Sequence, residues 1–131
     1  MSLTSQPHVL LVEDEPLIRM LTVDMLDALG FAATEAANGA EALAIDDRTL
    51  ASLAGLLIDL GLPDHSGEEV ARRLRQRRPD LPVILTTGAD ASGALANLAH
   101  GGPAVALEKP YQFSELEEAA VILKTSAGTV A

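Results

Sequence analysis

The sequence contains no cysteine and very few aromatic residues. Because none of its 131 residues carries a thiol, disulfide bonds, thiolate metal ligands and thiol catalysis are excluded. Aromatic side chains make up only 2% of the chain, so the core must be aliphatic, and nucleic-acid bases would find few rings on which to stack. A hydrophobic share of 48% is enough for a packed core in one domain of this length.

Basic residues are also scarce. Nine lysine and arginine residues against nineteen acidic residues leave a formal net charge of −10 at pH 7. This charge repels phosphate backbones and anionic lipids, so we expect no direct contact with nucleic acid and no membrane binding. Residues 1–7 lack the basic start and apolar core of a signal peptide, and no apolar run approaches the length of a membrane span. We therefore expect one cytoplasmic domain over 1–131, with its core at about 8–124.

Five short apolar segments alternate with five segments that have helical signals. The apolar segments, which predict strands, span 8–12, 31–36, 54–58, 82–86 and 104–107. The helical segments span 16–29, 39–45, 66–78, 91–99 and 114–124. Such alternation is typical of an α/β fold in which a parallel sheet has right-handed crossovers and helices on both faces.

Local signals mark where these helices begin and end. Asn38 is a predicted N-cap, and Gly30 is a predicted C-cap. The capping-box pattern marks two further helix starts, at Ser66 with Glu69 and at Ser114 with Glu117. Residues 46–48 look like a polar joint before the third strand. The third predicted helix carries arginines at 72, 73, 75, 77 and 78. They predict a solvated basic face, and contact with an acidic partner is the alternative.

Polar side chains stand at the ends of four predicted strands. Glu13 and Asp14 follow the first strand, Asp59 the third, Thr87 the fourth and Lys109 the fifth. Each alone has an ordinary explanation, as a helix-entry charge, a turn residue or a solvated amine. Because the carboxyl ends of parallel strands meet at one edge of the sheet, where open α/β folds bind ligands, we expect these residues to converge.

The chemistry of this group points to phosphoryl transfer. Three clustered carboxylates repel one another unless a cation lies among them, and oxygen ligands without nearby histidine or cysteine favour magnesium over zinc. Lys109 supplies a positive charge for one phosphoryl oxygen, and Thr87 supplies a hydroxyl for another. These are the groups needed to place a phosphoryl group on Asp59 as an acyl phosphate.

Four motifs resemble those of the receiver domain of two-component response regulators. They are the acidic pair after Val-Leu-Leu-Val, Ile-Asp-Leu-Gly-Leu-Pro-Asp around Asp59, Val-Ile-Leu-Thr-Thr-Gly ending at Gly88, and Glu-Lys-Pro around Lys109. The resemblance covers about 8–123 of the chain. It implies a flavodoxin-like, three-layer α/β/α fold with strand order 2-1-3-4-5.

The resemblance also implies the role of each residue in the site. Asp59 would be the phosphoacceptor, and Asp14, Asp59 and the backbone carbonyl of Gly61 would bind magnesium. Glu13 would hold the metal through water. Lys109 would grip the phosphoryl group.

The switch that reports phosphorylation departs from the family pattern. In the family, the threonine hydroxyl, here Thr87, moves toward the phosphoryl group. Many receivers also have tyrosine or phenylalanine three residues before the lysine, but this chain has Ala106, so the usual aromatic swing cannot occur. We therefore expect intact phosphoacceptance with an unusual readout. The family implies a partner surface, also an expected homodimer surface, formed by the predicted elements over 91–99, 104–107 and 114–124.

The sequence favours a stand-alone receiver as the function. It would accept a phosphoryl group from a histidine kinase or a histidine phosphotransfer protein, with Mg²⁺ as cofactor, and signal by contact with an unknown protein target. It would transfer the group to itself and dephosphorylate itself, and would not be a turnover enzyme.

Three alternatives remain at this point. The chain could be the receiver of a hybrid histidine kinase or a degenerate receiver used only for protein interaction, although the intact site argues against the latter. The third is a phosphohydrolase of the haloacid dehalogenase type. That family normally has its nucleophile on the first strand and another aspartate two residues later, where this chain has Gly61.

Overall fold

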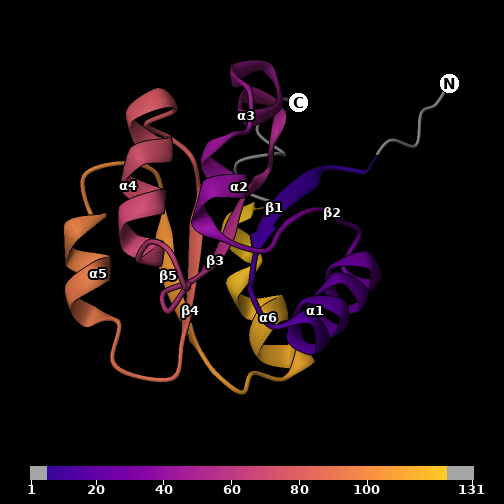
Figure 1. Ribbon diagram of the computed structural model, residues 1–131. Helices are drawn as coiled ribbons and strands as arrows, with labels where there is room; N and C mark the ends of the chain where they lie inside the picture. The colour runs from indigo at the N-terminus through magenta and orange to yellow at the C-terminus, as the bar shows by residue number, and fades with distance from the viewer. Residues whose placement is uncertain (1–5, 124–131) are drawn as a thin grey trace, which may run out of the picture.

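The computed structural model describes residues 6–123 and contains one five-stranded parallel sheet. The order β2-β1-β3-β4-β5 confirms the predicted topology (Figure 1). The strands are β1 (His8–Val12), β2 (Ala32–Ala36), β3 (Gly55–Asp59), β4 (Val83–Thr87) and β5 (Ala104–Glu108). The last helix, α6 (Phe113–Ala119), ends earlier than the predicted end at Lys124, with Ala120 as its C-cap. Lys124 and the tail after it lie outside the described residues.

Burial explains why the central strands are continuous apolar runs. Every residue of β3 and β4 is buried, because helices cover both faces of the sheet. β2 and β5 form the two edges and are only partly buried. The five strands run in parallel, so the side chains that follow their carboxyl ends reach one edge of the sheet.

The helices form two layers, one on each face of the sheet (Figure 1). One layer contains α1 (Pro16–Ala28) and α6 (Phe113–Ala119), which bury Leu26 and Leu116 against the sheet. The other layer, within residues 6–123, contains α2 (Gly39–Leu43), α3 (Asp47–Ser52), α4 (Gly67–Arg77) and α5 (Ser92–Asn97). The result is the predicted three-layer α/β/α architecture, with an aliphatic core on each side of the sheet.

The structure corrects the predicted polar joint at 46–48 and the predicted start of the last helix. The expected polar joint at 46–48 is instead the start of α3, because the Asp46 carboxylate accepts a hydrogen bond from the Thr49 amide and Leu50 is buried. The last helix begins at Phe113, one residue earlier than predicted. There, the Glu115 carboxylate accepts a hydrogen bond from the Gln112 amide at 2.8 Å, so Ser114 is not the capping residue.

The capping box predicted at the start of α4 forms only in part. The Ser66 hydroxyl accepts a hydrogen bond from the Glu69 amide at 3.0 Å. The Glu69 carboxylate, however, pairs with Arg72 on the next turn. Gly67 is required at the first position of α4, because a β-carbon there would overlap the Asp59 carbonyl. This close approach sets α4 directly against the end of β3.

The predicted solvated arginine face forms only in part: Arg72, Arg73 and Arg77 are exposed, whereas Arg75 is buried. Arg75 is 8% exposed, and its guanidinium donates hydrogen bonds to four carbonyls, those of Leu81, Leu98, Gly102 and Pro103. Arg77 donates to the carbonyl of Ile45 at 2.6 Å, and Arg78 to that of Leu53 at 2.7 Å. These side chains therefore hold loops of the α2 to α5 layer against α4.

None of the helices between residues 6 and 123 has the length and apolar content that crossing a membrane requires.

Candidate functional site

Asp59 is the last residue of β3 and lies at the carboxyl edge of the sheet. It is 7% exposed, between β1 and β4. Its Oδ1 atom accepts a hydrogen bond from the Gly61 amide at 3.2 Å, in the turn that follows the strand. The apolar strand therefore presents one carboxylate at its end, held by the backbone of its own turn.

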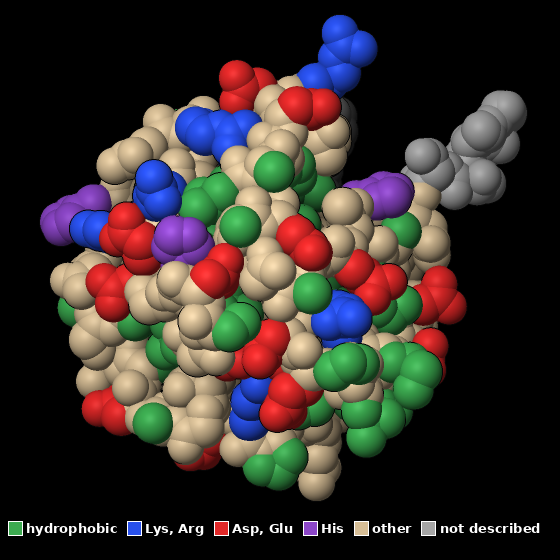
Figure 2. All heavy atoms as spheres, in the orientation of Figure 1, with side chains coloured by type: hydrophobic (Ala, Val, Ile, Leu, Met, Phe, Trp, Pro, Cys, Tyr) green, Lys and Arg blue, Asp and Glu red, His purple; other side chains and the backbone are tan. Residues whose placement is uncertain are grey.

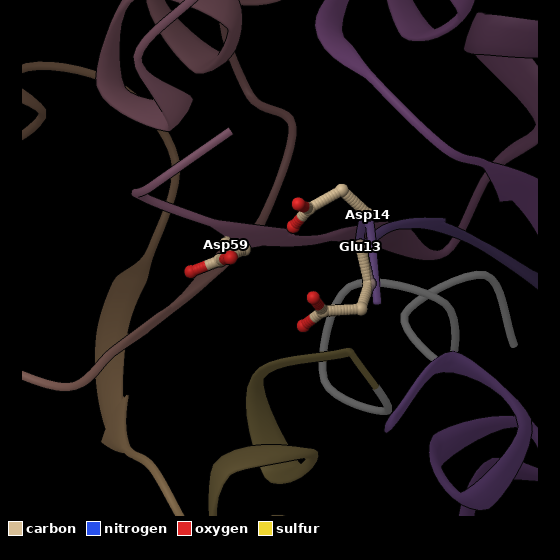
Figure 3. A group of neighbouring side chains, drawn as sticks. All are labelled: Glu13, Asp14 and Asp59. Carbon is tan, nitrogen blue, oxygen red and sulfur yellow. The ribbon is translucent and has the colours of Figure 1, made fainter. Parts of the chain in front are cut away.

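The acidic pair after β1 lies beside Asp59. β1 and β3 are adjacent and parallel, so Glu13 and Asp14 leave the sheet at the same edge. Carboxylate oxygens of Glu13, Asp14 and Asp59 all lie within 4.8 Å of one another, and Figure 3 shows the three side chains converging. Glu13 is only 2% exposed, whereas Asp14 is partly exposed.

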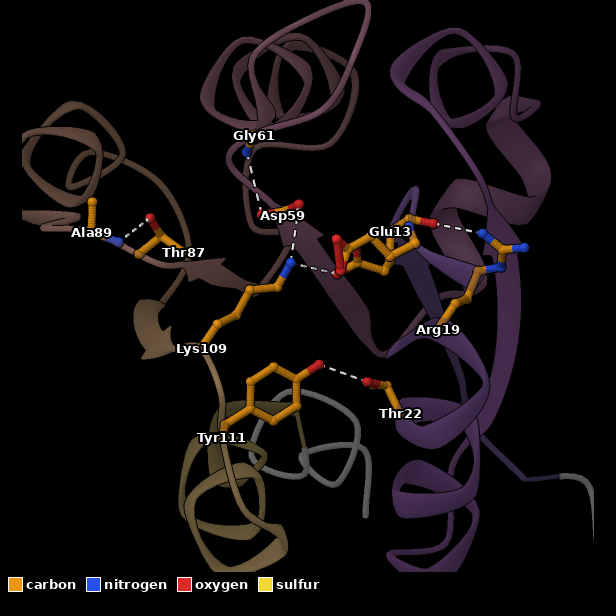
Figure 4. A network of polar contacts seen from close by, with 10 residues as sticks. Glu13, Arg19, Thr22, Asp59, Gly61, Thr87, Ala89, Lys109 and Tyr111 are labelled. Atoms are coloured by element: carbon orange, nitrogen blue, oxygen red, sulfur yellow. Dashed lines mark hydrogen bonds and ion pairs between the residues drawn. The ribbon is translucent and has the colours of Figure 1, made fainter. Parts of the chain in front are cut away.

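Lys109 completes this group from the edge strand on the far side of β4. It follows β5, and its amide donates a hydrogen bond to the Thr87 carbonyl at 2.8 Å. Its side chain reaches back past β4, so that Nζ lies 3.2 Å from Asp59 Oδ2 and 2.9 Å from Glu13 Oε1 (Figure 4). One ammonium thus bridges the carboxylates that end β1 and β3.

Burial and charge pairing alter the acidity of these groups. Burial raises the pKa of Glu13, against the opposing effect of hydrogen bonds from Lys109 and the Glu15 amide. Burial works against the charge of Lys109, but hydrogen bonds to Glu13 and Asp59 outweigh it and raise the pKa of the amine. Lys109 is therefore cationic at neutral pH.

Two further contacts support the site and were not predicted from the sequence. The Arg19 guanidinium donates a hydrogen bond from Nη1 to the Glu13 carbonyl at 2.7 Å (Figure 4). It also pairs with Glu35 at 3.2 Å. The Tyr111 and Thr22 hydroxyls share a hydrogen bond of 2.6 Å. No motif in the sequence signals either contact: Arg19 reaches back to the turn between β1 and α1 and across to β2, and Thr22 joins α1 to Tyr111.

Thr87 ends β4 at the same edge, but its hydroxyl is directed elsewhere. The hydroxyl accepts a hydrogen bond from the Ala89 amide at 3.0 Å, and Figure 4 shows it turned away from Lys109. Ala106 is exposed on β5, outside the carboxylate pocket. The structure therefore brings Glu13, Asp14, Asp59 and Lys109 together, and places Thr87 at the rim.

The donor set of this pocket fits a hard divalent cation. Its three carboxylates offer only oxygen ligands, and burial makes their mutual repulsion costly without a cation. Figure 2 shows acidic side chains spread over the visible face, with a cluster around one basic side chain at the lower centre. The carboxylates of Glu13, Asp14 and Asp59 suit magnesium better than zinc.

Fold and site together define a doubly wound α/β protein with a carboxylate and lysine site at the carboxyl edge of its sheet. The model of the response regulator receiver domain matches residues 9–121. The chain therefore belongs to the receiver domain family of two-component signalling, as its motifs had indicated.

Relatives of two kinds match the chain. It is 34% identical to the probable transcriptional regulatory protein TcrX of Mycobacterium tuberculosis, over 93% of this chain and 52% of the relative. It is 32% identical to the sensor kinase CckA of Brucella abortus, over 87% of this chain but 12% of the relative. The chain thus spans about half, or far less, of the length of these curated relatives.

Solved structures agree with this assignment. The receiver domain of a sensor histidine kinase from Pseudomonas aeruginosa PAO1 is 29% identical, with a TM-score of 0.72 over 95% of this chain and 99% of the other. That structure holds a magnesium ion coordinated in the active-site cleft. The receiver domain of a putative LuxO repressor protein from Vibrio parahaemolyticus is 28% identical, with a TM-score of 0.81 over 96% of each chain.

Proposed function

We propose that Asp59 accepts a phosphoryl group from a phosphohistidine of a histidine kinase or phosphotransfer protein. The observation that carries this proposal is the position of Lys109 Nζ, 3.2 Å from Asp59 Oδ2, beside the carboxylates of Glu13 and Asp14. A nucleophilic carboxylate, a fixed ammonium and a cation site in one pocket are the parts that phosphoryl transfer requires.

The transfer is a substitution at phosphorus. An Asp59 carboxylate oxygen forms a bond to phosphorus as the bond from phosphorus to the donor imidazole nitrogen breaks. The electron pair of that bond returns to the imidazole, which takes a proton from solvent. The Lys109 ammonium would then bind one phosphoryl oxygen. The Thr87 hydroxyl would rotate away from the Ala89 amide and bind a second phosphoryl oxygen. Water later hydrolyses the acyl phosphate, which regenerates the Asp59 carboxylate and releases inorganic phosphate.

Magnesium would be held by Asp14, Asp59 and the carbonyl of Gly61, with Glu13 reached through water. When bound, it would neutralise charge on the carboxylates and on the transferred phosphoryl oxygens. The chain's own contribution is to position these ligands. The Gly61 amide orients Asp59, and Arg19 holds the backbone of Glu13.

The exposed side of α1 suits the phosphodonor partner. Leu17, Met20 and Leu21 are among its exposed large apolar residues, with Leu17 at 63%, and green side chains gather over α1 in Figure 2. A groove of about 430 Å³ beside them is lined by Leu21, Tyr111 and Lys109, so it adjoins the site. This supports docking of a histidine-bearing helix at α1, close to Asp59.

The protein would act as a signalling phosphoacceptor in the cytoplasm and not as a turnover enzyme. Its relatives include regulators and sensor kinases, so both a stand-alone receiver and the receiver of a hybrid kinase stay as alternatives. The receiver family match leaves the haloacid dehalogenase alternative without support. We also propose that it signals by contact with a downstream protein target, and that it can form a homodimer through α5, β5 and α6.

The test is incubation with Mg²⁺ and a small acyl phosphate, followed by intact-protein mass spectrometry. The wild type gains one phosphoryl group, and Asp59→Asn gains none. Asp24→Asn, an exposed carboxylate on α1, serves as the matched control and gains the group normally. An unmodified wild type would point to a pure interaction module, and rapid repeated hydrolysis of phosphate esters would point to a hydrolase.

A further inference from the structure

A pocket of about 230 Å³ lies between α4 and the end of α5, and we call it the α4–α5 pocket. The two helices are neighbours in Figure 1, and the Asn97 side-chain amide on α5 donates a hydrogen bond to the Glu68 carboxylate on α4 at 2.7 Å. The pocket shares no residue with the carboxylate site around Asp59. Its polar lining and the glycine beside it are Arg72, Arg75, Gln76, Asn97, His100 and Gly101.

The polar side chains that line the α4–α5 pocket are cationic or neutral. They are two guanidinium groups, two amides and one imidazole, and none of the described residues that line the pocket is an aspartate or a glutamate. The chain as a whole carries a net charge of −10, so this lining differs in charge from the rest of the molecule. Such a set of donors favours an anion as ligand.

Arg75 brings a buried positive charge to the wall of the pocket. It is 8% exposed, and four of its five N–H groups donate hydrogen bonds to backbone carbonyls. The fifth, on Nη1, has no acceptor within residues 6–123. No carboxylate in that range pairs with the guanidinium, and burial lowers its pKa. A buried charge without a counter-charge is costly, so an anion in the pocket would stabilise it.

Gly101 leaves this end of the guanidinium uncovered. A β-carbon at this position would lie 2.9 Å from Nη1 of Arg75 and 2.7 Å from the Pro79 carbonyl oxygen, and both distances are too short for an ordinary contact. The φ angle of Gly101 is not positive, so its backbone conformation does not require glycine. The missing side chain therefore matters for space, because it keeps Nη1 accessible beside the pocket.

The size and the donors of the pocket indicate a small ligand with a phosphate group. Its volume of about 230 Å³ is below the roughly 300–1,000 Å³ of pockets that enclose drug-sized ligands. Two guanidinium groups match the charge of a phosphate monoester, which is close to −2 at neutral pH. Arg72 pairs with Glu69 at the protein surface, and because exposed ion pairs are weak, its guanidinium is available to a ligand.

We propose that the α4–α5 pocket binds the phosphate group of a small phosphorylated molecule. Arg72 and the spare N–H on Nη1 of Arg75 would donate to phosphate oxygens, and the side chains of Gln76, Asn97 and His100 would surround the attached group. A ligand held in this way would bridge α4 and α5 and stabilise the folded chain. The site is separate from Asp59, so the proposal does not rest on the proposed function.

Titration of glycerol 3-phosphate into isotopically labelled protein without magnesium, followed by backbone amide NMR, tests this site. Glycerol is the matched probe, because it lacks only the phosphate group. We expect glycerol 3-phosphate to shift amides of 72–76 and 97–102 with a dissociation constant of about 1 mM, and glycerol to shift none of them. Inorganic phosphate is the third probe. Equal affinity assigns the pocket to the free ion and weaker binding assigns it to an ester, and a phosphate site is supported in both cases.

Variants at the rim of the pocket avoid the folding defect expected when Arg75 is replaced. Gln76→Glu places a carboxylate in the lining and should weaken binding about fivefold or more, whereas Gln6→Glu, the same change at an exposed residue outside the pocket, should have less than about a twofold effect. Arg72→Gln should weaken binding about three- to tenfold. Arg73→Gln, at an exposed residue of α4 that does not line the pocket, is its control.

Several outcomes would overturn the proposal: equal shifts with glycerol, shifts confined to amides of 59–61 and 109, or no shifts at about 10 mM glycerol 3-phosphate. Equal weakening by Gln76→Glu and Gln6→Glu would show a general effect of charge in place of a site. Binding of a short phosphoserine peptide without binding of glycerol 3-phosphate would assign the pocket to a protein partner and refute the small ligand. None of these results changes the gain of a phosphoryl group at Asp59, so either proposal can fail without the other.

Discussion

Lys109 makes its shorter ion pair, 2.9 Å, with Glu13, whose side chain is only 3% exposed. The lysine side chain itself is 19% exposed, so the pair lies at the floor of the pocket and not at its surface. Before phosphorylation, the lysine thus compensates a buried carboxylate as well as facing Asp59. Its removal should affect folding and chemistry together.

We expect Lys109→Met to lower the free energy of unfolding by about 2 kcal/mol at pH 7, because it leaves Glu13 buried without its cation. Urea unfolding followed by circular dichroism measures this loss. In the Glu13→Gln background the same substitution should cost clearly less, since a neutral amide needs no counter-charge. Equal losses in both backgrounds would show that the ion pair contributes nothing.

Arg19 should affect the metal site without contacting metal. Arg19→Lys keeps the positive charge but loses the guanidinium group, which donates hydrogen bonds to both the Glu13 carbonyl and the Glu35 carboxylate. We expect magnesium affinity to fall about threefold, in line with loss of one hydrogen bond of modest net strength. Magnesium titration followed by amide NMR gives the constant, with Arg48→Lys on α3 as control. Identical constants for Arg19→Lys and wild type would rule out this positioning role.

Acid stability should depend on Asp64. Its carboxylate accepts hydrogen bonds from the Gly39 and Ala40 amides, both at 2.9 Å, and these lower its pKa below 3.8. A carboxyl with a lowered folded-state pKa stabilises the fold above the unfolded value, and this contribution disappears as pH falls through the folded-state pKa.

Asp64→Asn should therefore be less stable than the wild type at neutral pH, and the difference should shrink below pH 3.8. Thermal midpoints measured across this range give both curves. Asp24→Asn, on the exposed side of α1, is the control and should follow the wild type. A difference that stays constant down to the most acidic pH would contradict the assignment.

Arg75→Met should be destabilising, because four carbonyls lose a common buried donor. We expect a loss of about 3 kcal/mol in urea unfolding, together with faster amide exchange in residues 98–103. Arg73→Met, an exposed neighbour on α4, should change stability by less than about 0.5 kcal/mol. If both variants behave alike, Arg75 does not hold this loop.

Much of the fold was predictable, because it depends on local patterns. The apolar runs 55–58 of β3 and 83–85 of β4 are evident in the sequence, and the residues that end both strands are charged or hydroxylated. α3 was missed because Asp46 looks like a loop residue in the sequence. In the structure its carboxylate caps the helix by accepting a hydrogen bond from the Thr49 amide. Arg75 was misjudged because three of its four acceptors, the carbonyls of Leu98, Gly102 and Pro103, lie 23 to 28 residues further along the chain.

By itself, the sequence determined the alternation of strands and helices, the aliphatic core and the kinds of chemical group at the strand ends, because these follow from residue type and spacing. Only the tertiary structure decided that Lys109 would pair with Glu13 as well as Asp59, and that the Thr87 hydroxyl would face Ala89. Such relationships depend on distances across the sheet, and local sequence patterns do not specify those distances.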